Sequence, residues 1–307
     1  MTLYTHQSSN ITKTWLLMGV FLGLVAFLGY FASVYFGDPS ILTFAIIFSV
    51  VMNISAYWFS DKIALAVSGA KEIQMKDNPE LWRTAENIAI ASGLPMPRLY
   101  IINDSAPNAF ATGRDKKHAA IAVTTGLLAK LEKLELEGVL AHEFAHIGNK
   151  DILLMSVVAV LVGLIQIMAD WIIRFSLHGG RDSDGKHPIF LIVGFVLLIF
   201  SPIIAMLIQL AISRRREFLA DATGALITRY PEGLASALEK ISDYSNPLAK
   251  ANKGTAHMFI ATPFGGDMNK DGIPDKKQKA SFLTKIFMTH PPMEERIRAL
   301  LGERTKQ

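Results

Sequence analysis

The 307-residue sequence predicts an α-rich integral membrane protein that also carries a small mixed α/β unit outside the lipid. Hydrophobic residues make up 50% of the chain and charged residues only 19%, which is too apolar a balance for an ordinary soluble domain. Four long apolar runs alternate with polar stretches, and each run reaches the roughly 20 residues that a helix needs to cross a bilayer. The predicted parts are a transmembrane hairpin at 1–60, a polar part at 61–151, a second hairpin at 152–212 and a second polar part at 213–307.

The first two apolar runs predict a membrane hairpin at the N-terminus. The runs are Trp15 to Phe36 and Ile41 to Phe59, and the Gly37-Asp38-Pro39-Ser40 sequence between them is typical of a tight turn. A cleaved signal peptide is the alternative for the first run. Its apolar core is usually only about 7–15 residues long, and no clear cleavage site of small residues follows here, so the hairpin is favoured.

The other two apolar runs, Ile152 to Phe175 and Ile189 to Ile212, are also long enough to span a membrane. A buried helical hairpin outside the lipid is the alternative, because polar residues such as Asp170 interrupt these runs. The Arg214-Arg215-Arg216 cluster follows the fourth run, and the positive-inside rule assigns it to the cytoplasm. Four spans would then place both termini and both polar parts on the cytoplasmic side.

The polar stretch up to residue 150 predicts helices and short strands. Asn78 is expected to cap a helix that has Pro79 at its first position. In chain order, the elements are this helix up to Gly93, strands over Arg98–Ile102 and Ala119–Thr124, and a second helix over Leu131–His146.

Composition excludes several kinds of site. The chain has no cysteine, so a disulfide, a thiolate metal site and a cysteine nucleophile are impossible, and any metal must be held by His, Asp or Glu. The formal net charge of +4 is too small to indicate nucleic acid. The positive-inside rule already accounts for the basic residues beside the apolar runs.

The segment His142-Glu143-Phe144-Ala145-His146 matches the H-E-x-x-H pattern. Residues four apart lie on one face of a helix, so both imidazoles can bind one ion. Glu143 lies one position along, where its carboxylate can take a proton from an attacking water that zinc has acidified. A chance match is the alternative, but the pattern falls at the end of a predicted helix, as the chemistry requires.

A third ligand is needed, because catalytic zinc usually has three protein ligands and one open position. Glu217 is the candidate. It follows the fourth apolar run while His146 precedes the third, so the second hairpin would return Glu217 to the histidine pair. Asp221, one turn further on, can hydrogen-bond the outer nitrogen of a ligand histidine. The alternative for Glu217 is an ion pair with the preceding arginines.

These motifs resemble those of the HtpX-type membrane metalloproteases, which are relatives of the type I CAAX prenyl proteases. The resemblance rests on His142-Glu143-x-x-His146, Glu217-x-x-x-Asp221 and the closing His290-Pro291-Pro292-Met293-Glu294-Glu295-Arg296-Ile297, in this order. It implies one zinc ion held by His142, His146 and Glu217, with Glu143 as general base and Asp221 as the acid behind the ligands.

The resemblance also implies roles for two further segments. Asn108-Ala109-Phe110-Ala111-Thr112-Gly113 is similar to the family's edge strand, which pairs with an extended polypeptide substrate; a plain surface turn is the alternative. His290 and Arg296 are similar to a pair that steadies the oxyanion, although Arg296 could instead pair with an acidic neighbour on a solvated face. The family is associated with quality control of membrane proteins in the bacterial inner membrane.

Several other polar residues are expected to have no specific function. Asp267-x-Asn269-x-Asp271-Gly272-x-x-Asp275 has the alternating oxygens of a calcium loop, but it lacks the bidentate Glu at the twelfth position, so a solvated polar loop is favoured. The remaining histidines are expected to be ordinary surface or loop residues: His6, His118, His178, His187 and His257.

We therefore expect a membrane-anchored, zinc-dependent endopeptidase. Two other classes stay open. The first is a catalytically silent membrane adaptor, against which the intact Glu143 argues. The second is a metal transporter that uses His142, His146 and Glu217; these residues lie at the ends of spans and not at the middle depth where transport sites are usually built.

Overall fold

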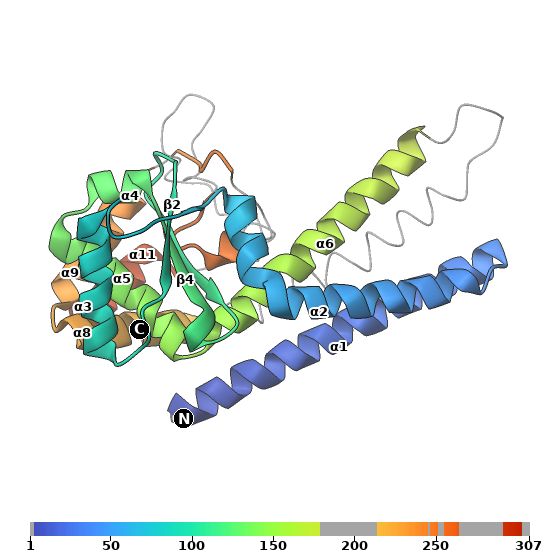
Figure 1. Cartoon of the computed structure of the whole chain (residues 1–307), viewed down its shortest axis with the longest axis horizontal. Helices are drawn as coiled ribbons and strands as arrows, with labels where there is room; N and C mark the ends of the chain where they lie inside the picture. The colour runs from blue at the N-terminus through green and yellow to red at the C-terminus, as the bar shows by residue number, and fades with distance from the viewer. Residues whose placement is uncertain (1–2, 179–213, 245, 251–254, 264–290, 303–307) are drawn as a thin grey trace.

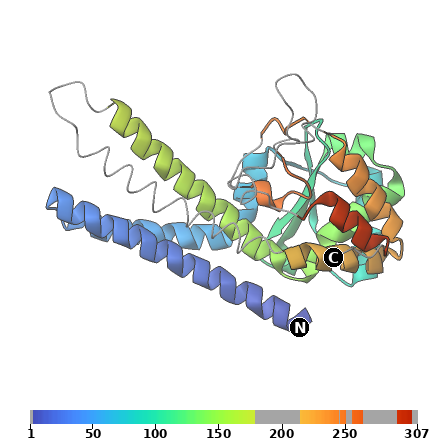
Figure 2. The ribbon, with the colours of Figure 1, turned by 180° about the vertical axis from the view of Figure 1, so that it is seen from behind.

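A mixed α/β unit with long projecting helices makes up the part of the chain that the structure describes (Figure 1). The structure is a computed structural model. Helices α1 (Leu3–Phe36), α2 (Ser40–Ser68) and α6 (Asp151–His178) extend to one side of the unit in both ribbon views (Figures 1 and 2). The predicted helix-rich architecture is confirmed. The described residues are 3–178, 214–244, 246–250, 255–263 and 291–302.

Helices α1 and α2 form the predicted hairpin, and each is long and apolar enough to cross a membrane. Gly37 makes the turn between them with a φ of +69°, a conformation that glycine adopts without steric cost. Large apolar side chains remain exposed on the hairpin, including Phe44 at 70% and Trp58 at 50%. Such a surface suits contact with lipid and makes the hairpin a fitting membrane anchor.

The third apolar run forms helix α6, which meets helix α5 (Lys133–Gly148) at an angle of 86°. By length and composition, α5 and the part of α6 up to Ile167 together form one further candidate span, broken at this bend. Leu154 of α6 packs in one buried cluster with Leu17 and Phe21 of α1. The first and third apolar runs therefore lie side by side. The fourth run, residues 189–212, lies outside the described residues, so the four-span arrangement stays a prediction.

One mixed sheet of four strands forms the centre of the unit, in the order β1-β2-β4-β3. The predicted strands β2 and β4 are confirmed and pair in parallel. Strand β3 runs antiparallel to β4, with Ala111 opposite Ile121, and ends one side of the sheet. It is therefore an edge strand, as expected, and not a surface turn. The strands are β1 Lys71–Glu72, β2 Arg98–Ile102, β3 Ala109–Gly113 and β4 Ala119–Thr124.

Helices pack against the sheet and enclose the core. Helix α3 (Pro79–Ser92) begins at its predicted cap, where the Leu81 N–H donates to the Asn78 side chain (2.9 Å), and it ends at Gly93 as predicted. Phe144 of α5 is fully buried in a cluster with side chains of α3 and the sheet. The other helical elements are α4 (Thr125–Lys130), α8 (Arg214–Thr228), α9 (Pro231–Ser242), α11 (Met293–Leu300) and the 3-10 turns η1 (Lys116–His118) and η2 (Ala256–Met258).

Two local expectations are corrected. The second predicted helix does not run from Leu131, because α4 ends at Lys130 and Leu131 is extended (φ −93°, ψ 139°) before α5 begins. His257, expected at the surface, is buried in η2, and its Nε2 lies 2.9 Å from the Met155 carbonyl oxygen. The Asp267–Asp275 segment lies outside the described residues.

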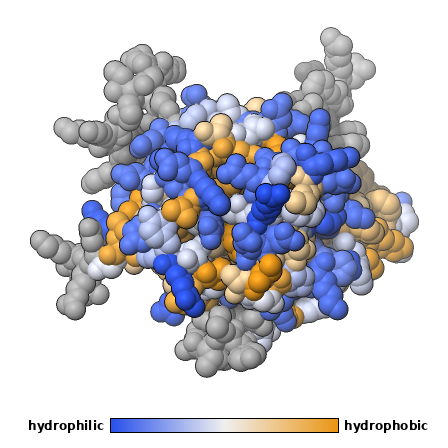
Figure 3. All heavy atoms as spheres, turned by 60° about the vertical axis from the view of Figure 1, so that its left-hand side comes forward, coloured by the Kyte–Doolittle hydropathy of each residue, from blue (hydrophilic) through white to orange (hydrophobic). Residues whose placement is uncertain are grey.

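The end of the α/β unit that faces away from the long helices has a largely hydrophilic surface with scattered apolar side chains (Figure 3). This is the usual surface of a domain in water. It contrasts with the exposed apolar hairpin and agrees with a unit that lies outside the lipid.

Candidate metal centre

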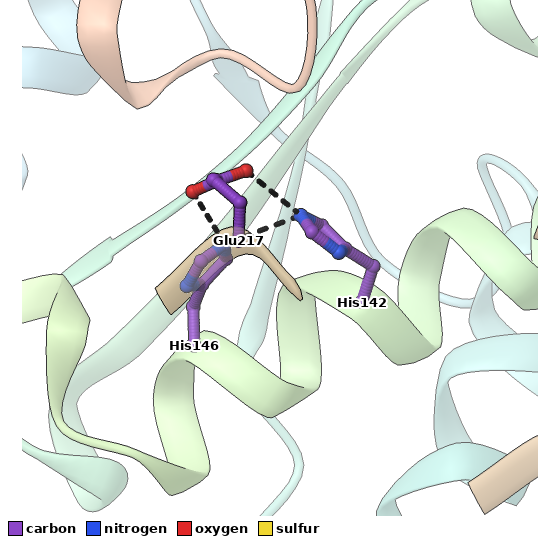
Figure 4. Close-up of side chains that lie close together, drawn as sticks. All are labelled: His142, His146 and Glu217. Carbon is purple, nitrogen blue, oxygen red and sulfur yellow. Dashed lines mark hydrogen bonds and ion pairs between the residues drawn. The ribbon is translucent and has the colours of Figure 1, made fainter. Parts of the chain in front are cut away.

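The H-E-x-x-H segment lies in the second half of helix α5. A capping box starts this helix: the Glu132 side chain accepts from the Glu135 backbone N–H, and the Glu135 carboxylate accepts from the Glu132 N–H (2.8 Å). His142, Glu143 and His146 are all buried. The two imidazoles lie on one face of the helix with their Nε2 atoms 3.2 Å apart (Figure 4).

Glu217 of helix α8 completes the cluster. Its carboxylate oxygens lie 3.8 Å from His142 Nε2 and 3.7 Å from His146 Nε2, and donor atoms of the three residues fit within 4.8 Å (Figure 4). Gly224, two turns further along α8, allows this approach, because a Cβ there would lie only 3.0 Å from the His142 backbone nitrogen. The structure thus brings together the residues that the resemblance assigns to the metal.

Each ring nitrogen that faces away from the cluster meets a buried carboxylate. His142 Nδ1 lies 2.9 Å from an Asp221 oxygen, and His146 Nδ1 lies 3.0 Å from an Asp151 oxygen. Such bonds fix the tautomer and orientation of a ligand ring. Asp151 was not among the predicted residues, although a carboxylate at the start of an apolar run, five positions after His146, was a visible indication.

The cluster fits a zinc ion. With each Nδ1 bonded to a carboxylate, the two Nε2 atoms point into the same space, where one cation can take both as ligands. In a tetrahedral site with ligand distances of about 2.0–2.1 Å, donor atoms lie about 3.4 Å apart. The separations here are 3.2, 3.7 and 3.8 Å. Two imidazoles and one carboxylate are a known catalytic zinc set that leaves one position open.

Glu143 lies beside the cluster and next to the edge strand. Its carboxylate accepts a hydrogen bond from the Ala111 backbone N–H, and burial raises the pKa of the carboxyl to about 7. Its Oε2 atom is buried and has no hydrogen-bond partner among the described residues. This oxygen is therefore able to accept a hydrogen bond from a water molecule.

Burial and neighbouring charge act differently on the two histidines. Burial lowers the pKa of His142 to about 4. Burial also acts to lower the pKa of His146, but the Asp151 hydrogen bond and the Glu217 charge outweigh it and raise that pKa to about 9. Zinc bound at Nε2 would displace the extra proton, because a ligand histidine is neutral. For Asp221, burial opposes ionisation but the Arg296 charge prevails and lowers its pKa to about 2.

Arg296 of helix α11 is fully buried and pairs with Asp221 in a bidentate manner. Its Nε donates to Oδ2 (2.9 Å) and its Nη2 to Oδ1 (2.6 Å), and Nη2 also lies 3.4 Å from the His142 ring nitrogens. The alternative of a pair with an acidic neighbour on a solvated face is therefore wrong. His290, its expected companion, lies outside the described residues.

The outer edge of strand β3 already makes contacts within the chain. The Ala109 carbonyl accepts from the Ile260 N–H (2.9 Å), and the Asn108 side chain lies 3.0 Å from the carbonyl and 3.3 Å from the N–H of Ala261. Alternate residues of a strand point to the same side, so the Ala111 carbonyl faces the same way as that of Ala109. Residues 260 and 261 thus continue the sheet only at the Asn108 end of β3.

Side chains of β3 fix the strand between α6 and η2. Phe110 packs edge-to-face on Phe259, with ring centroids 4.9 Å apart. Thr112 Oγ1 lies 2.7 Å from Ser156 Oγ on α6. These contacts hold the backbone of β3 next to Glu143.

Known proteins match this chain along most of its length. The model of Peptidase family M48 matches residues 75–304. A "Protease HtpX homolog" of Caldanaerobacter subterraneus subsp. tengcongensis is 46% identical over 307 residues, and one of Tropheryma whipplei (strain Twist) is 41% identical over 298 residues; each alignment covers 97% of both proteins. The crystal structure of S. mikatae Ste24p aligns over 97% of this chain and 67% of its own, with a TM-score of 0.49 and 19% identity. The family matches confirm the predicted resemblance, and the chain belongs to peptidase family M48, among the HtpX-type membrane metalloproteases.

Proposed function

We propose that this protein is a zinc-dependent endopeptidase of the bacterial inner membrane that hydrolyses internal peptide bonds of membrane or misfolded proteins. The observation that carries the proposal is the buried cluster of His142, His146 and Glu217 directly beside Glu143. In this arrangement, residues 61–151 and 213–307 form one catalytic unit, and residues 1–60 and 152–212 form its hairpins.

Each residue of the centre has a separate role. His142, His146 and Glu217 would hold a zinc ion, which when bound would acidify a water molecule and polarise the scissile carbonyl. Glu143 accepts the proton of the attacking water and then passes it to the leaving amine. The Ala111 N–H keeps the Glu143 carboxylate in place while its second oxygen receives the water.

The oxyanion would need donors besides the ion. A hydrogen-bond donor aimed at the negative oxygen of the transition state contributes strongly to turnover. We propose His290 and Arg296 as these donors. For Arg296 the bidentate bond to Asp221 supports a second contribution, which is to hold the carboxylate that orients His142.

The edge of β3 supports the assignment of the substrate. An extended peptide can add to it as a further strand through the carbonyls of Ala111 and Gly113, beyond the point where Ile260 bonds to Ala109; the N–H groups of Ala111 and Gly113 face Glu143 and Ser156. Strand addition requires a segment with free backbone groups. Unfolded or misfolded polypeptides offer such segments, and compact folded proteins do not.

The position of the centre supports a protease over the other classes. The ligands lie on α5 and α8 within the α/β unit and not at the middle of a span, which disfavours a transporter. A silent adaptor would have no use for a buried carboxylate with a vacant acceptor oxygen beside the ligands.

The first prediction tests Glu143. Glu143→Gln in the full-length protein in detergent should retain zinc, because the ligands remain, while casein cleavage falls by about 10²–10⁴-fold because proton transfer is lost. Zinc content and cleavage rate are measured on the same preparations. Glu137→Gln is the matched control, since Glu137 lies on the same helix away from the cluster. Near-normal cleavage by Glu143→Gln would contradict the mechanism.

A further inference from the structure

The anchor helix α1 reaches the metal centre through one buried side chain, that of Asn10, which is 4% exposed. Its Nδ2 donates to Asp151 Oδ1 (2.6 Å) and lies 3.5 Å from the Asn149 carbonyl oxygen, while its Oδ1 accepts from Arg216 Nη1 (3.3 Å). A buried amide with both ends bonded is held in one orientation. Asn10 lies ahead of Trp15, where the apolar run of α1 begins, and close to the start of the candidate span Ser8–Phe36.

Both partners of Asn10 adjoin proposed metal ligands. Asp151 uses its other oxygen, Oδ2, to hold Nδ1 of His146 at 3.0 Å. Arg216 directly precedes Glu217 on α8, and its Nε lies 3.9 Å from Asp151 Oδ1. The Asn10 side chain thus links Asp151, whose carboxylate bonds His146, to Arg216, the residue that precedes Glu217.

The path of the chain brings Asp151 to this position. Helix α5 ends at Gly148, and Lys150 adopts a left-handed φ of +59°, a conformation uncommon for a residue with a side chain. The chain therefore turns by 86° before α6 begins at Asp151. This turn carries the Asp151 carboxylate back to the face of α5 that holds His146.

We propose that Asp151 and Asn10 are positioning residues of the metal centre, so that helix α1 is part of the zinc site as well as an anchor. The inference rests on the proposed function in that it takes His146 as a ligand. The His146 Nδ1–H donates to Asp151, which keeps the Nε2 lone pair directed at the ion. Asn10 occupies the second oxygen of Asp151. Without Asn10, the nearby Arg216 guanidinium would draw the carboxylate away from His146.

Zinc affinity of the full-length protein in detergent tests the proposal, measured by competition with a chromogenic chelator. Asp151→Ala should weaken zinc binding by about 10–100-fold, as loss of a carboxylate behind a ligand histidine typically does. Asn10→Leu should weaken it by about tenfold, at the lower end of that range. Because these are binding measurements, they do not depend on proteolysis.

Asn53→Leu is the matched control. Asn53 is also buried, at 7% exposure, and its Nδ2 donates to the Met18 carbonyl of α1 (3.1 Å), within the hairpin and away from the metal cluster. This variant removes a buried asparagine bond to the same helix, so its zinc affinity should equal that of the wild type. An equal loss in Asn10→Leu and Asn53→Leu would mean that α1 acts only by general packing, and would overturn the proposal.

The double variant tests whether Asn10 acts through Asp151. Adding Asn10→Leu to Asp151→Ala should weaken zinc binding no further, because the carboxylate that Asn10 holds is gone. Full additivity, or unchanged affinity in Asn10→Leu alone, would overturn the inference. If Asn10→Leu does not fold, Asn10→Ser carries the same expectation. Unchanged zinc affinity in His146→Ala would instead refute the proposed metal centre itself.

Discussion

At the scale of single residues, the metal centre consists of buried charges that depend on one another. Asp221 receives two hydrogen bonds from Arg296 and lies 2.9 Å from His142, and all three side chains are buried. A buried ion pair adds little when compared with a well-packed apolar pair, but the removal of one partner leaves the other charge uncompensated. Loss of the Arg296 side chain should therefore lower the stability of the fold.

Arg296→Gln should lower the free energy of unfolding by about 3–5 kcal/mol, because it leaves the Asp221 carboxylate buried without its cation. Chemical unfolding in detergent, followed by tryptophan fluorescence, measures the change. Arg298→Gln is the control, since Arg298 is exposed on the same helix. Equal stability of the two variants would show that the Arg296–Asp221 pair does not stabilise the fold.

At the scale of elements, helix α5 organises the unit, because helices α3, α8 and α9 all pack directly on it. Helix α8 packs on α5 with the face that carries Glu217, Asp221 and Gly224, which recur at helical spacing. Helix α9 is joined to the start of α5, where the Glu135 carboxylate accepts hydrogen bonds from Ser236 (2.6 Å) and Lys240 (2.8 Å). The close packing of α8 on α5 at Gly224 and the bonds from α9 to Glu135 can be tested separately.

Gly224→Ala should weaken zinc binding, because its Cβ would lie 3.0 Å from the His142 nitrogen and 3.2 Å from the Ala141 carbonyl carbon. These are backbone atoms that cannot turn aside, so α8 and Glu217 must move away from α5. Overpacking of this kind costs about 1–3 kcal/mol, against a gain of about 1 kcal/mol in helix propensity. Chelator competition measures the effect. Gly163→Ala, with nothing within 4 Å of its Cβ, should leave the affinity unchanged.

Glu135 should make part of the stability dependent on pH. Burial alone would raise the pKa of its carboxyl, but hydrogen bonds from Lys240 and Ser236 outweigh burial and lower it. A lowered folded-state pKa gives stability that is present above the unfolded pKa of about 4.3 and is lost as pH falls through the folded pKa. Glu135→Gln should therefore cost about 1–3 kcal/mol at pH 7 and progressively less below about pH 4.

Unfolding midpoints of the wild type and Glu135→Gln at a series of pH values measure this difference. Glu239→Gln, at an exposed position of α9, provides the control and should show no such trend. A difference between wild type and Glu135→Gln that stays constant down to low pH would contradict the assignment.

At the scale of the whole molecule, the α/β unit and the long helices α1 and α6 pack together. Helix α6 leaves the end of α5 and packs on α1, and its Ser156 contacts the edge strand beside Glu143. His146 contacts Asp151 at the first residue of α6 (3.0 Å), so the candidate metal centre lies at the start of that long helix. This arrangement agrees with the proposed membrane-anchored protease.

The proposed orientation can be tested with single-cysteine variants, because the chain has no cysteine of its own. Pro39→Cys, at the exposed hairpin turn, should react with a membrane-impermeant maleimide in intact spheroplasts. Lys117→Cys, on the exposed η1 turn of the catalytic unit, should react only after the cells are permeabilised. The reason is the basic cluster at residues 214–216, which the positive-inside rule assigns to the cytoplasm. Labelling of Lys117→Cys in intact spheroplasts would reverse the orientation.

The sequence by itself determined the features that depend on neighbouring residues. The spacing of His142 and His146 places both rings on one helix face because the helix repeats every 3.6 residues. Asn78 and Gly93 mark the ends of α3 because cap geometry is decided within one turn. The apolar runs identified the hairpin because span length follows from bilayer thickness. Glu217 and Asp221 were proposed because the second hairpin would return Glu217 to the histidine pair and Asp221 lies one helical turn further on, and the order of family motifs supported both.

Only the tertiary structure decided which distant groups meet at the centre. Arg296 faces Asp221 across 75 residues, and Asn10 meets Asp151 across 141. Asp151 reaches His146 because Lys150 adopts a left-handed backbone conformation, which the neighbouring residues do not predict. These contacts depend on how whole helices pack, and packing is determined by the combined shape of many side chains, so no short pattern along the chain encodes it.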